Sequence, residues 1–278
     1  MSFLVLLLVI WAEKFSAWRL RIQRDRFYLG ELARLEASPR LAKEPWLVLA
    51  LWILLPALLL TLLLMALKPV AYGLLALPIH FLVVVYSLGR GDLQATMGPF
   101  RDAWRRGEEQ AALHVAERDL GVTADNAPSL LEKVQAHMLW QAFQSFFAVI
   151  FWYFVLGPAV ALSYRLLALA AEHSKVPAVA ERAAQLRHAF DWVPVRLLAA
   201  SFALVGNFVA VTKVMVHELL NWHISAKQLI ADVGHVAGEI PAPVVGAEGV
   251  SSLNSLWELL LRSAVLWYAG FALWTLFF

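Results

Sequence analysis

The chain contains no cysteine and few charged residues. None of its 278 residues is cysteine, so disulfide bonds and thiolate metal sites within the chain are excluded. Charged residues make up only 16% of the sequence and hydrophobic residues 61%, whereas soluble domains have about 25% charged and about 45–50% apolar residues. Because a chain that spans a membrane must satisfy its backbone polar groups internally, this composition predicts an all-α polytopic membrane protein with about four or five transmembrane or re-entrant helices.

The sequence also lacks the features of a protein that binds nucleic acid or metal. Its formal net charge is only +2, and no dense basic patch is interleaved with aromatic residues. His217 and His223 are six residues apart, which places them on different faces of a helix, so we expect no metal and no cofactor. The twelve tryptophans suit the aromatic belts at the boundaries of a lipid bilayer, which we expect to be the main partner.

The N-terminal part contains the clearest membrane segment. Trp46 to Leu67 carries no charge and is long enough to span a bilayer, and Val70 to Leu88 is expected to return across it. Phe3 to Trp11 is too short to span and is interpreted as a buried or interfacial helix. Phe15 to Leu35 has apolar residues at helical spacing and arginines mostly on other faces. This pattern is typical either of a basic helix in the membrane interface or of a helix packed on the protein core.

The central polar segment, 89–142, is predicted to form helices outside the membrane. Basic residues are concentrated in 13–44, before the first predicted span, and the positive-inside rule then places both segments on the cytoplasmic side. Exposed helices in 89–142 are candidates for contact with a partner protein.

The apolar run 143–171 is longer than a simple span. Gly157-Pro158 near its middle predicts either two half-helices beside a cavity or one tilted, kinked helix. A short polar helix is expected over 172–188, followed by a membrane helix with Pro194 in its first turn that includes 198–216. The predicted regions are a basic amphipathic segment 1–44, a transmembrane hairpin 45–88, the polar segment 89–142, a membrane core 143–216, a polar helix and linker 217–257, and a C-terminal span 258–278.

Charged residues at membrane depth are the leading site candidates. An ion placed there costs about 2.5–3.5 kcal/mol on insertion scales, so such residues usually serve a function. Asp191, Arg196 and Arg165 stand at or inside the apolar segments. A purely structural interpretation remains open, in which Asp191 caps a helix and Arg196 extends to the lipid headgroups.

Several short motifs resemble the AmpE family. They are Asp191-Trp-Val-Pro-Val-Arg-Leu197, Leu139-Trp140 leading into Phe151-Trp152, and Gly157-Pro158 followed by Tyr164-Arg165. The resemblance covers essentially the whole chain. It implies a multi-pass protein of the bacterial inner membrane with a role in peptidoglycan recycling, β-lactamase regulation and antibiotic resistance, as a sensor or transducer.

The AmpE family in turn is similar to the CobD/CbiB membrane synthases, which form an amide bond during cobalamin assembly. Gly157, Pro158, Tyr164 and Arg165 match one synthase motif, and Asp191, Pro194 and Arg196 match another. The Glu-Asn element expected before the Gly-Pro helix is absent, the polar residues expected after Tyr-Arg are apolar here, and only Glu13 remains of an N-terminal motif. Cobinamide synthesis is therefore not expected.

Three hypotheses follow. In the first, the chain is a non-enzymatic regulator that binds an anionic small molecule, lipid or muropeptide in a cavity. The candidate ligand-binding residues are Arg165, Asp191, Arg196, Tyr164 and Glu13, while Gly157, Pro158 and Pro194 shape the helices. In the second, the chain is a CobD/CbiB-like enzyme acting on an amide- or phosphate-containing precursor, although no nucleophile–base pair is evident. In the third, the chain is a structural subunit without a ligand.

Overall fold

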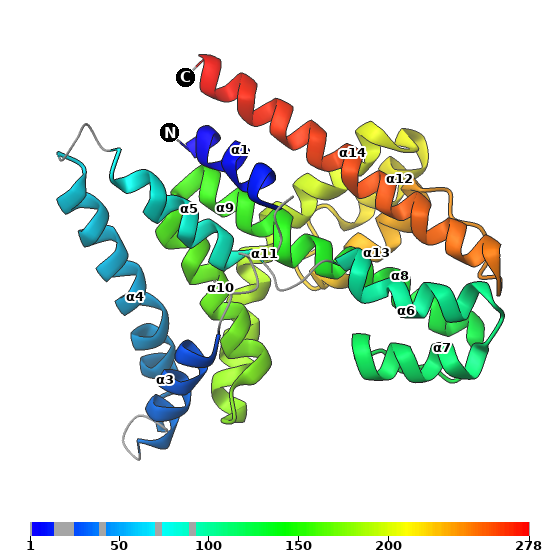
Figure 1. Ribbon diagram of the computed structural model, residues 1–278, viewed down its shortest axis with the longest axis horizontal. Coiled ribbons are helices and arrows are strands. Elements are labelled where there is room, and N and C mark those ends of the chain that lie inside the picture. The colour runs from blue at the N-terminus through cyan, green and yellow to red at the C-terminus, as the bar shows by residue number, and fades with distance from the viewer. Residues whose placement is uncertain (1, 14–24, 39–42, 70–73, 89–92, 278) are drawn as a thin grey trace. The chain divides into compact units, whose positions relative to one another are not determined.

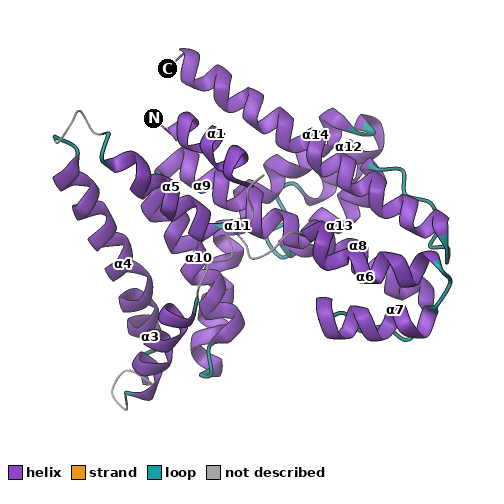
Figure 2. Cartoon of the chain, in the orientation of Figure 1, coloured by secondary structure: helices purple, strands orange, loops and turns teal. Residues whose placement is uncertain are grey.

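The computed structural model describes residues 2–13, 25–38, 43–69, 74–88 and 93–277, and the regular elements in these ranges are all helices (Figure 1). Figure 2 shows these helices joined by loops and turns. Four helical stretches are long and apolar enough to cross a membrane, namely Pro45–Leu67, Ala127–Leu156, Pro177–Val205 and Ala247–Phe277. The prediction of an all-α membrane protein is thereby confirmed.

The chain forms two compact units, and each is built from two stretches of sequence. Unit 1 comprises Met1–Arg90 and Ala148–Asp191, and unit 2 comprises Gly91–Phe147 and Trp192–Phe278. The helices of unit 1 are α1 (Ser2–Glu13), α3 (Arg26–Ala37), α4 (Pro45–Leu67), α5 (Ala76–Ser87), α9 (Ala148–Leu156), α10 (Pro158–His173) and the first part of α11 (Pro177–Val205). Those of unit 2 are α6 (Leu93–Arg105), α7 (Glu109–Val115), the π-helix η3 (Ala116–Leu120), α8 (Ala127–Ala142), the π-helix η4 (Phe143–Phe147), the rest of α11, α12 (Phe208–Glu218), α13 (Ala226–Ala237) and α14 (Ala247–Phe277).

Unit 1 is organised around α10, which packs against α3, α4, α5 and α9. Apolar side chains of these helices form its core, among them Leu49, Leu162, Leu166 and Leu169. Trp52 adds a polar link, since its indole Nε1 donates a 3.0 Å hydrogen bond to the carbonyl of Leu166. Helix α10 is therefore central in unit 1. Polar side chains of α10 that are buried there need hydrogen-bond partners within the unit, because burying an unpaired polar group costs free energy.

In unit 2, α13 and α14 both pack against α8. Two buried hydrogen bonds fix helices that are distant in sequence. The Gln135 amide donates to Ser252 Oγ at 2.7 Å, and the Trp267 indole donates to Ser201 Oγ at 2.8 Å. Because a buried donor costs free energy when it lacks an acceptor, these pairs favour one specific helix arrangement.

Several helix boundaries differ from those expected from the sequence. The first predicted span is confirmed as α4, but its expected return helix, α5, has only 12 residues. At 1.5 Å per residue that is about 18 Å, which is shorter than the bilayer core. Residues 14–24 and 70–73 of the predicted N-terminal and return helices lie outside the described residues.

The largest correction concerns α11. It runs for 29 residues from Pro177 to Val205, so Pro194 lies inside a helix and not in its first turn. Proline removes one helical hydrogen bond, and helices packed among others tolerate this loss. The expected apolar helix over 198–216 is therefore two elements, because α11 ends at Val205 and α12 begins at Phe208.

Candidate functional site

The candidate site of unit 1 is positioned by the start of α10. Gly157 has φ +86°, a left-handed conformation that favours glycine, and Pro158 occupies the first helical position, where its missing N–H costs nothing. The break between α9 and α10 at Gly157-Pro158 thus follows from these two residues. It sets the rotation of α10, on which Tyr164 and Arg165 are neighbours about 100° apart. The two side chains consequently enter different networks.

The first network joins Arg165 to an acid that precedes α3. Arg165 Nη2 donates to Asp25 Oδ2 at 3.1 Å, and the Tyr86 hydroxyl donates to Asp25 Oδ1 at 3.1 Å. The Asp25 carboxylate is buried, and 15% of the Arg165 side chain is exposed. Arg165 Nε is buried and has no hydrogen-bond partner among the residues that the structure describes. The guanidinium therefore has unused donor capacity beside a buried carboxylate.

The second network links α10 to α11. The Tyr164 hydroxyl donates to Asp191 Oδ1 at 2.7 Å, and Arg187 Nε lies 3.7 Å from Asp191 Oδ2. Arg187 Nη1 in turn donates to Glu172 Oε1 at 2.9 Å. Asp191 is 2% exposed and Tyr164 is 1% exposed. The four side chains thus form two links between adjacent helices, a buried one at Asp191 and a partly exposed one at Glu172. Asp191 lies inside α11, so it does not cap a helix end as the structural interpretation had it.

Four residues of these networks were missed in the sequence analysis. They are Asp25, Tyr86, Glu172 and Arg187. A signal was available for Arg187, since it precedes Asp191 by four residues on one helix, the spacing at which opposite charges meet. Asp25 gave no such signal, because its partners are 61 and 140 residues away in sequence.

Arg196 belongs to unit 2 and has a different role. Its Nη2 donates to the carbonyl of Asn221 at 2.7 Å and to that of Glu218 at 3.3 Å, and its Nε donates to the carbonyl of Leu219 at 2.5 Å. The guanidinium also lies over the Trp192 ring, 4.1 Å from its centroid. These carbonyls close the end of α12, where backbone acceptors lack helical partners, so Arg196 caps that helix.

The structure therefore assigns the five candidate ligand-binding residues to different environments. Tyr164 and Arg165 are adjacent on α10, and Asp191 contacts Tyr164. Arg196 bonds main-chain carbonyls of unit 2, and its hydrogen-bond partners include none of the other four. Glu13 is the last residue of α1, but its side chain is outside the described residues.

The chemistry available in unit 1 is recognition of anions. Arginine presents planar donors that match a carboxylate or phosphate in bidentate fashion, and Arg165 already holds one carboxylate. Within the described residues, no group of three or more His, Cys, Asp or Glu side chains is arranged to hold a metal ion.

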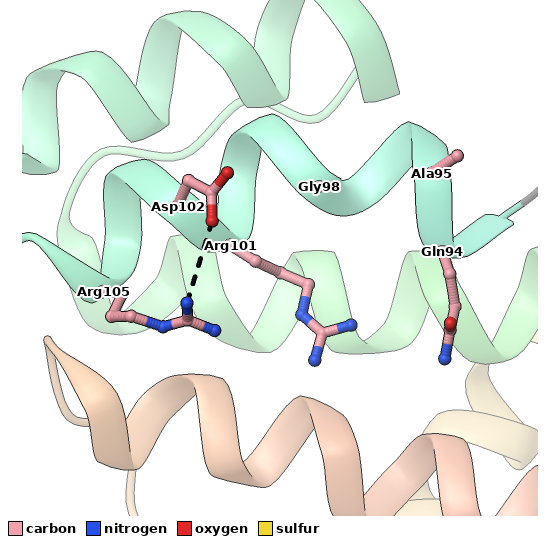
Figure 3. Close-up of a pocket in the computed structure, with 6 residues that line it drawn as sticks. All are labelled: Gln94, Ala95, Gly98, Arg101, Asp102 and Arg105. Carbon is pink, nitrogen blue, oxygen red and sulfur yellow. Dashed lines mark ion pairs between the residues drawn. The ribbon is translucent and has the colours of Figure 1, made fainter.

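Unit 2 carries an open hollow of about 390 Å³ along α6 (Figure 3). Its lining residues are Gln94, Ala95, Gly98, Arg101, Asp102 and Arg105. Arg105 lies 3.9 Å from Asp102, an exposed pair of the kind that contributes little to stability. The Arg101 guanidinium donates to Asn254 on α14. A Cβ at Gly98 would meet no atom within 4 Å, so the glycine leaves room between the polar side chains.

Comparisons with known proteins gave one match. A protein-family model described as "Regulatory signalling modulator protein AmpE" matches residues 1–237. No curated protein and no solved structure matches the chain.

Proposed function

The chain belongs to the AmpE family of regulatory signalling modulator proteins, and from this premise we propose that it is a sensor in the bacterial inner membrane. It crosses that membrane several times and binds an anionic ligand during peptidoglycan recycling and β-lactamase induction. The ligand is a carboxylate- or phosphate-bearing molecule such as a muropeptide fragment or a lipid.

One observation supports this proposal above the others, namely the ion pair between the partly buried Arg165 and the buried Asp25. Among the residues that the structure describes, Arg165 Nε is buried and has no hydrogen-bond partner, while its Nη2 donates to Asp25 at 3.1 Å. Buried polar atoms without partners are rare, and they are often found at functional sites. A bound anion would accept a hydrogen bond from Arg165 Nε and would compete with Asp25 for the other N–H groups of the guanidinium.

The same pair provides a way to signal occupancy. Asp25 immediately precedes α3 and also accepts from Tyr86 on α5, so it ties the start of α3 to α5 and α10. When a ligand takes over Arg165, Asp25 loses a buried counter-charge, and the attachment of α3 is weakened. In this proposal Asp191 and Tyr164 keep α10 fixed against α11 so that the response is confined to α3.

The output of the sensor is proposed to be a protein contact made by 89–142. The hollow on α6 supports this assignment, since Arg101 and Arg105 place positive charge along it that suits an acidic partner (Figure 3).

The experiment that tests the proposal is mass spectrometry of the small molecules and lipids retained by protein purified in mild detergent. We expect a specific anionic species on the unaltered protein that is lost from Arg165→Lys, because lysine cannot form a bidentate contact. Arg118→Lys is the matched control, since Arg118 also pairs with an aspartate but is exposed. Identical profiles for all three proteins would refute the ligand site.

A second measurement separates a regulator from an enzyme. Cells carrying Arg165→Lys should lose β-lactamase induction while the protein remains at its normal level, whereas Arg118→Lys should respond normally. Conversion of the retained species into a product by the purified protein would instead support the CobD/CbiB-like enzyme hypothesis. Normal induction in Arg165→Lys would remove Arg165 from the signalling role.

A further inference from the structure

Helix α12 is too short to span a bilayer, although its sequence is largely apolar. Its 11 residues extend about 16 Å, compared with a hydrocarbon core of about 30 Å. It follows α11 after only Gly206 and Asn207, so it starts where one of the candidate membrane spans ends.

Both ends of α12 are fixed within unit 2. At its start, the Asn207 side chain accepts from the N–H of Ala210 at 3.0 Å, and the N–H of Asn207 donates to the carbonyl of Ala237 at 3.2 Å. A Cβ on Gly206 would lie 2.6 Å from that same carbonyl oxygen, so the turn is closely packed. Its last carbonyls are held by Arg196. Helix α12 is therefore a built element of unit 2 and not a frayed end.

One side of α12 is packed and the opposite side is open. Val211 is fully buried, and α12 packs on α13. Within the helix, the open side carries Phe208 (58% exposed), Val209 (64%) and Val216 (66%) in an arc of about 100°, given about 100° per residue. Leu219 (45%) and Leu220 (82%) follow the end of the helix and add to the exposed apolar surface. Exposed apolar residues gathered in this way mark an interaction surface.

The charges beside this arc indicate the nature of the partner. Lys213 and His217 follow the apolar arc at one edge. Together with Phe208, Val209, Thr212 and Val216 they line an open hollow of about 450 Å³. Half-exposed Trp222 comes just after the helix. An apolar face bordered by basic residues, with a tryptophan near one end, is typical of helices that lie in the interface of an anionic membrane.

We propose that α12 with Leu219 to Trp222 lies along the surface of an anionic bilayer leaflet, with its apolar arc among the acyl chains and Lys213 at the headgroup phosphates. The sequence analysis instead placed residues 208–216 within a single membrane helix that includes 198–216, and assigned the following residues to a polar region. Here it is an interfacial anchor that senses the charge of the lipids next to α11. This role does not depend on the ligand of Arg165.

The absence of cysteine allows a direct test, because a single introduced thiol carries a fluorophore at a defined place. We label Val216→Cys and, for comparison, Gln228→Cys, which is exposed on the neighbouring helix α13. The full-length protein is reconstituted in phosphatidylcholine vesicles containing phosphatidylglycerol. Brominated lipids should quench the label at 216 while aqueous iodide should not, and the reverse should hold at 228.

The headgroup contact is tested by comparing brominated phosphatidylglycerol with brominated phosphatidylcholine. Lys213→Gln should lower the preference of the 216 label for the anionic quencher by about fivefold, the factor that one basic side chain near an anionic surface contributes. Lys227→Gln is the control, because it removes the same charge from an exposed position on α13.

Three outcomes would overturn the proposal. Equal iodide quenching at 216 and 228 would show that α12 faces water. Protection of 216 from both iodide and brominated lipids would show that protein covers the arc. An anionic preference that Lys213→Gln leaves unchanged would remove the headgroup contact.

Discussion

At the scale of single residues, the hydroxyl of Tyr164 is the group whose removal is most informative. It donates to a carboxylate that is 2% exposed, so Tyr164→Phe leaves Asp191 short of a partner. We expect a loss of about 1–3 kcal/mol in the free energy of unfolding, measured by thermal or denaturant unfolding in detergent. Combining it with Asp191→Ala should cost less than the sum of the two changes, because each change alone already removes the same hydrogen bond.

The control for this double-mutant cycle is Tyr28→Phe in the same unit. Tyr28 contacts Trp52 and Tyr86 through its ring, which phenylalanine retains. We therefore expect a change near zero. Additive losses from Tyr164→Phe and Asp191→Ala would contradict the hydrogen bond between them.

We expect His235 on α13 to make the stability of unit 2 depend on pH. Burial lowers the pKa of His235 below its ordinary value of about 6.5, and within the described part of the chain its Nε2 is buried without a hydrogen-bond partner. The folded state thus favours the neutral ring. The stability that the neutral His235 ring contributes is fully present above the pKa of histidine in the unfolded chain, about 6.5. It is lost as the pH falls from there toward the lower pKa of His235 in the folded protein.

The corresponding prediction compares unfolding temperatures of variants between neutral and mildly acidic pH. His235→Gln should lose less stability on acidification than the unaltered protein, because it removes one group that must be protonated against its environment. His223→Gln, at an exposed position, should behave like the unaltered protein. An acid sensitivity that is the same in all three would show that His235 does not contribute.

At the scale of elements, the attachment of α12 depends on Arg196. One guanidinium satisfies carbonyls of Glu218, Leu219 and Asn221, which a single ammonium group cannot reach in the same planar arrangement. In Arg196→Lys we expect faster amide hydrogen exchange over 208–222, by about tenfold if 1.4 kcal/mol of local stability is lost.

Arg262→Lys is the matched control for this change. Arg262 is exposed and reaches the carbonyl of Val205, the last residue of α11. Its replacement should leave exchange in α12 unaltered. If Arg196→Lys also leaves that exchange unaltered, then the cap is not what holds the end of α12.

The elements differ in how well the sequence predicted them. Helix α4 was predictable because 22 consecutive uncharged residues have few alternatives to a membrane helix. The boundary at Gly206-Asn207 was missed, although glycine followed by a potential capping asparagine is a recognisable signal, because the apolar residues on both sides suggested one span. At Pro194 the sequence predicted a helix start that the structure does not have. Proline is common in the first turn of a helix, but Pro194 lies inside α11.

At the scale of the whole molecule, the fold class was predictable from composition, while the site was predictable only in part. Tyr164, Arg165 and Asp191 are conspicuous as polar groups among apolar residues, and the structure places them in buried networks. Their partners come from distant segments, and no local pattern connects Arg165 with Asp25. The pairing is decided by the packing of α10 against α3 and α5, which depends on the assembled core.

The topology of the proposed multi-pass arrangement can be tested at α4. Lys43 and Lys68 lie at opposite ends of this helix, whose 23 residues extend about 34 Å and so exceed the bilayer core. The excess of basic residues in 13–44 predicts that Lys43 lies on the cytoplasmic side. In intact spheroplasts, a thiol reagent that cannot cross membranes should label Lys68→Cys but not Lys43→Cys, and disruption of the membrane should make both reactive. Labelling of Lys43→Cys alone would reverse the orientation, and labelling of both in intact spheroplasts would show that α4 does not span.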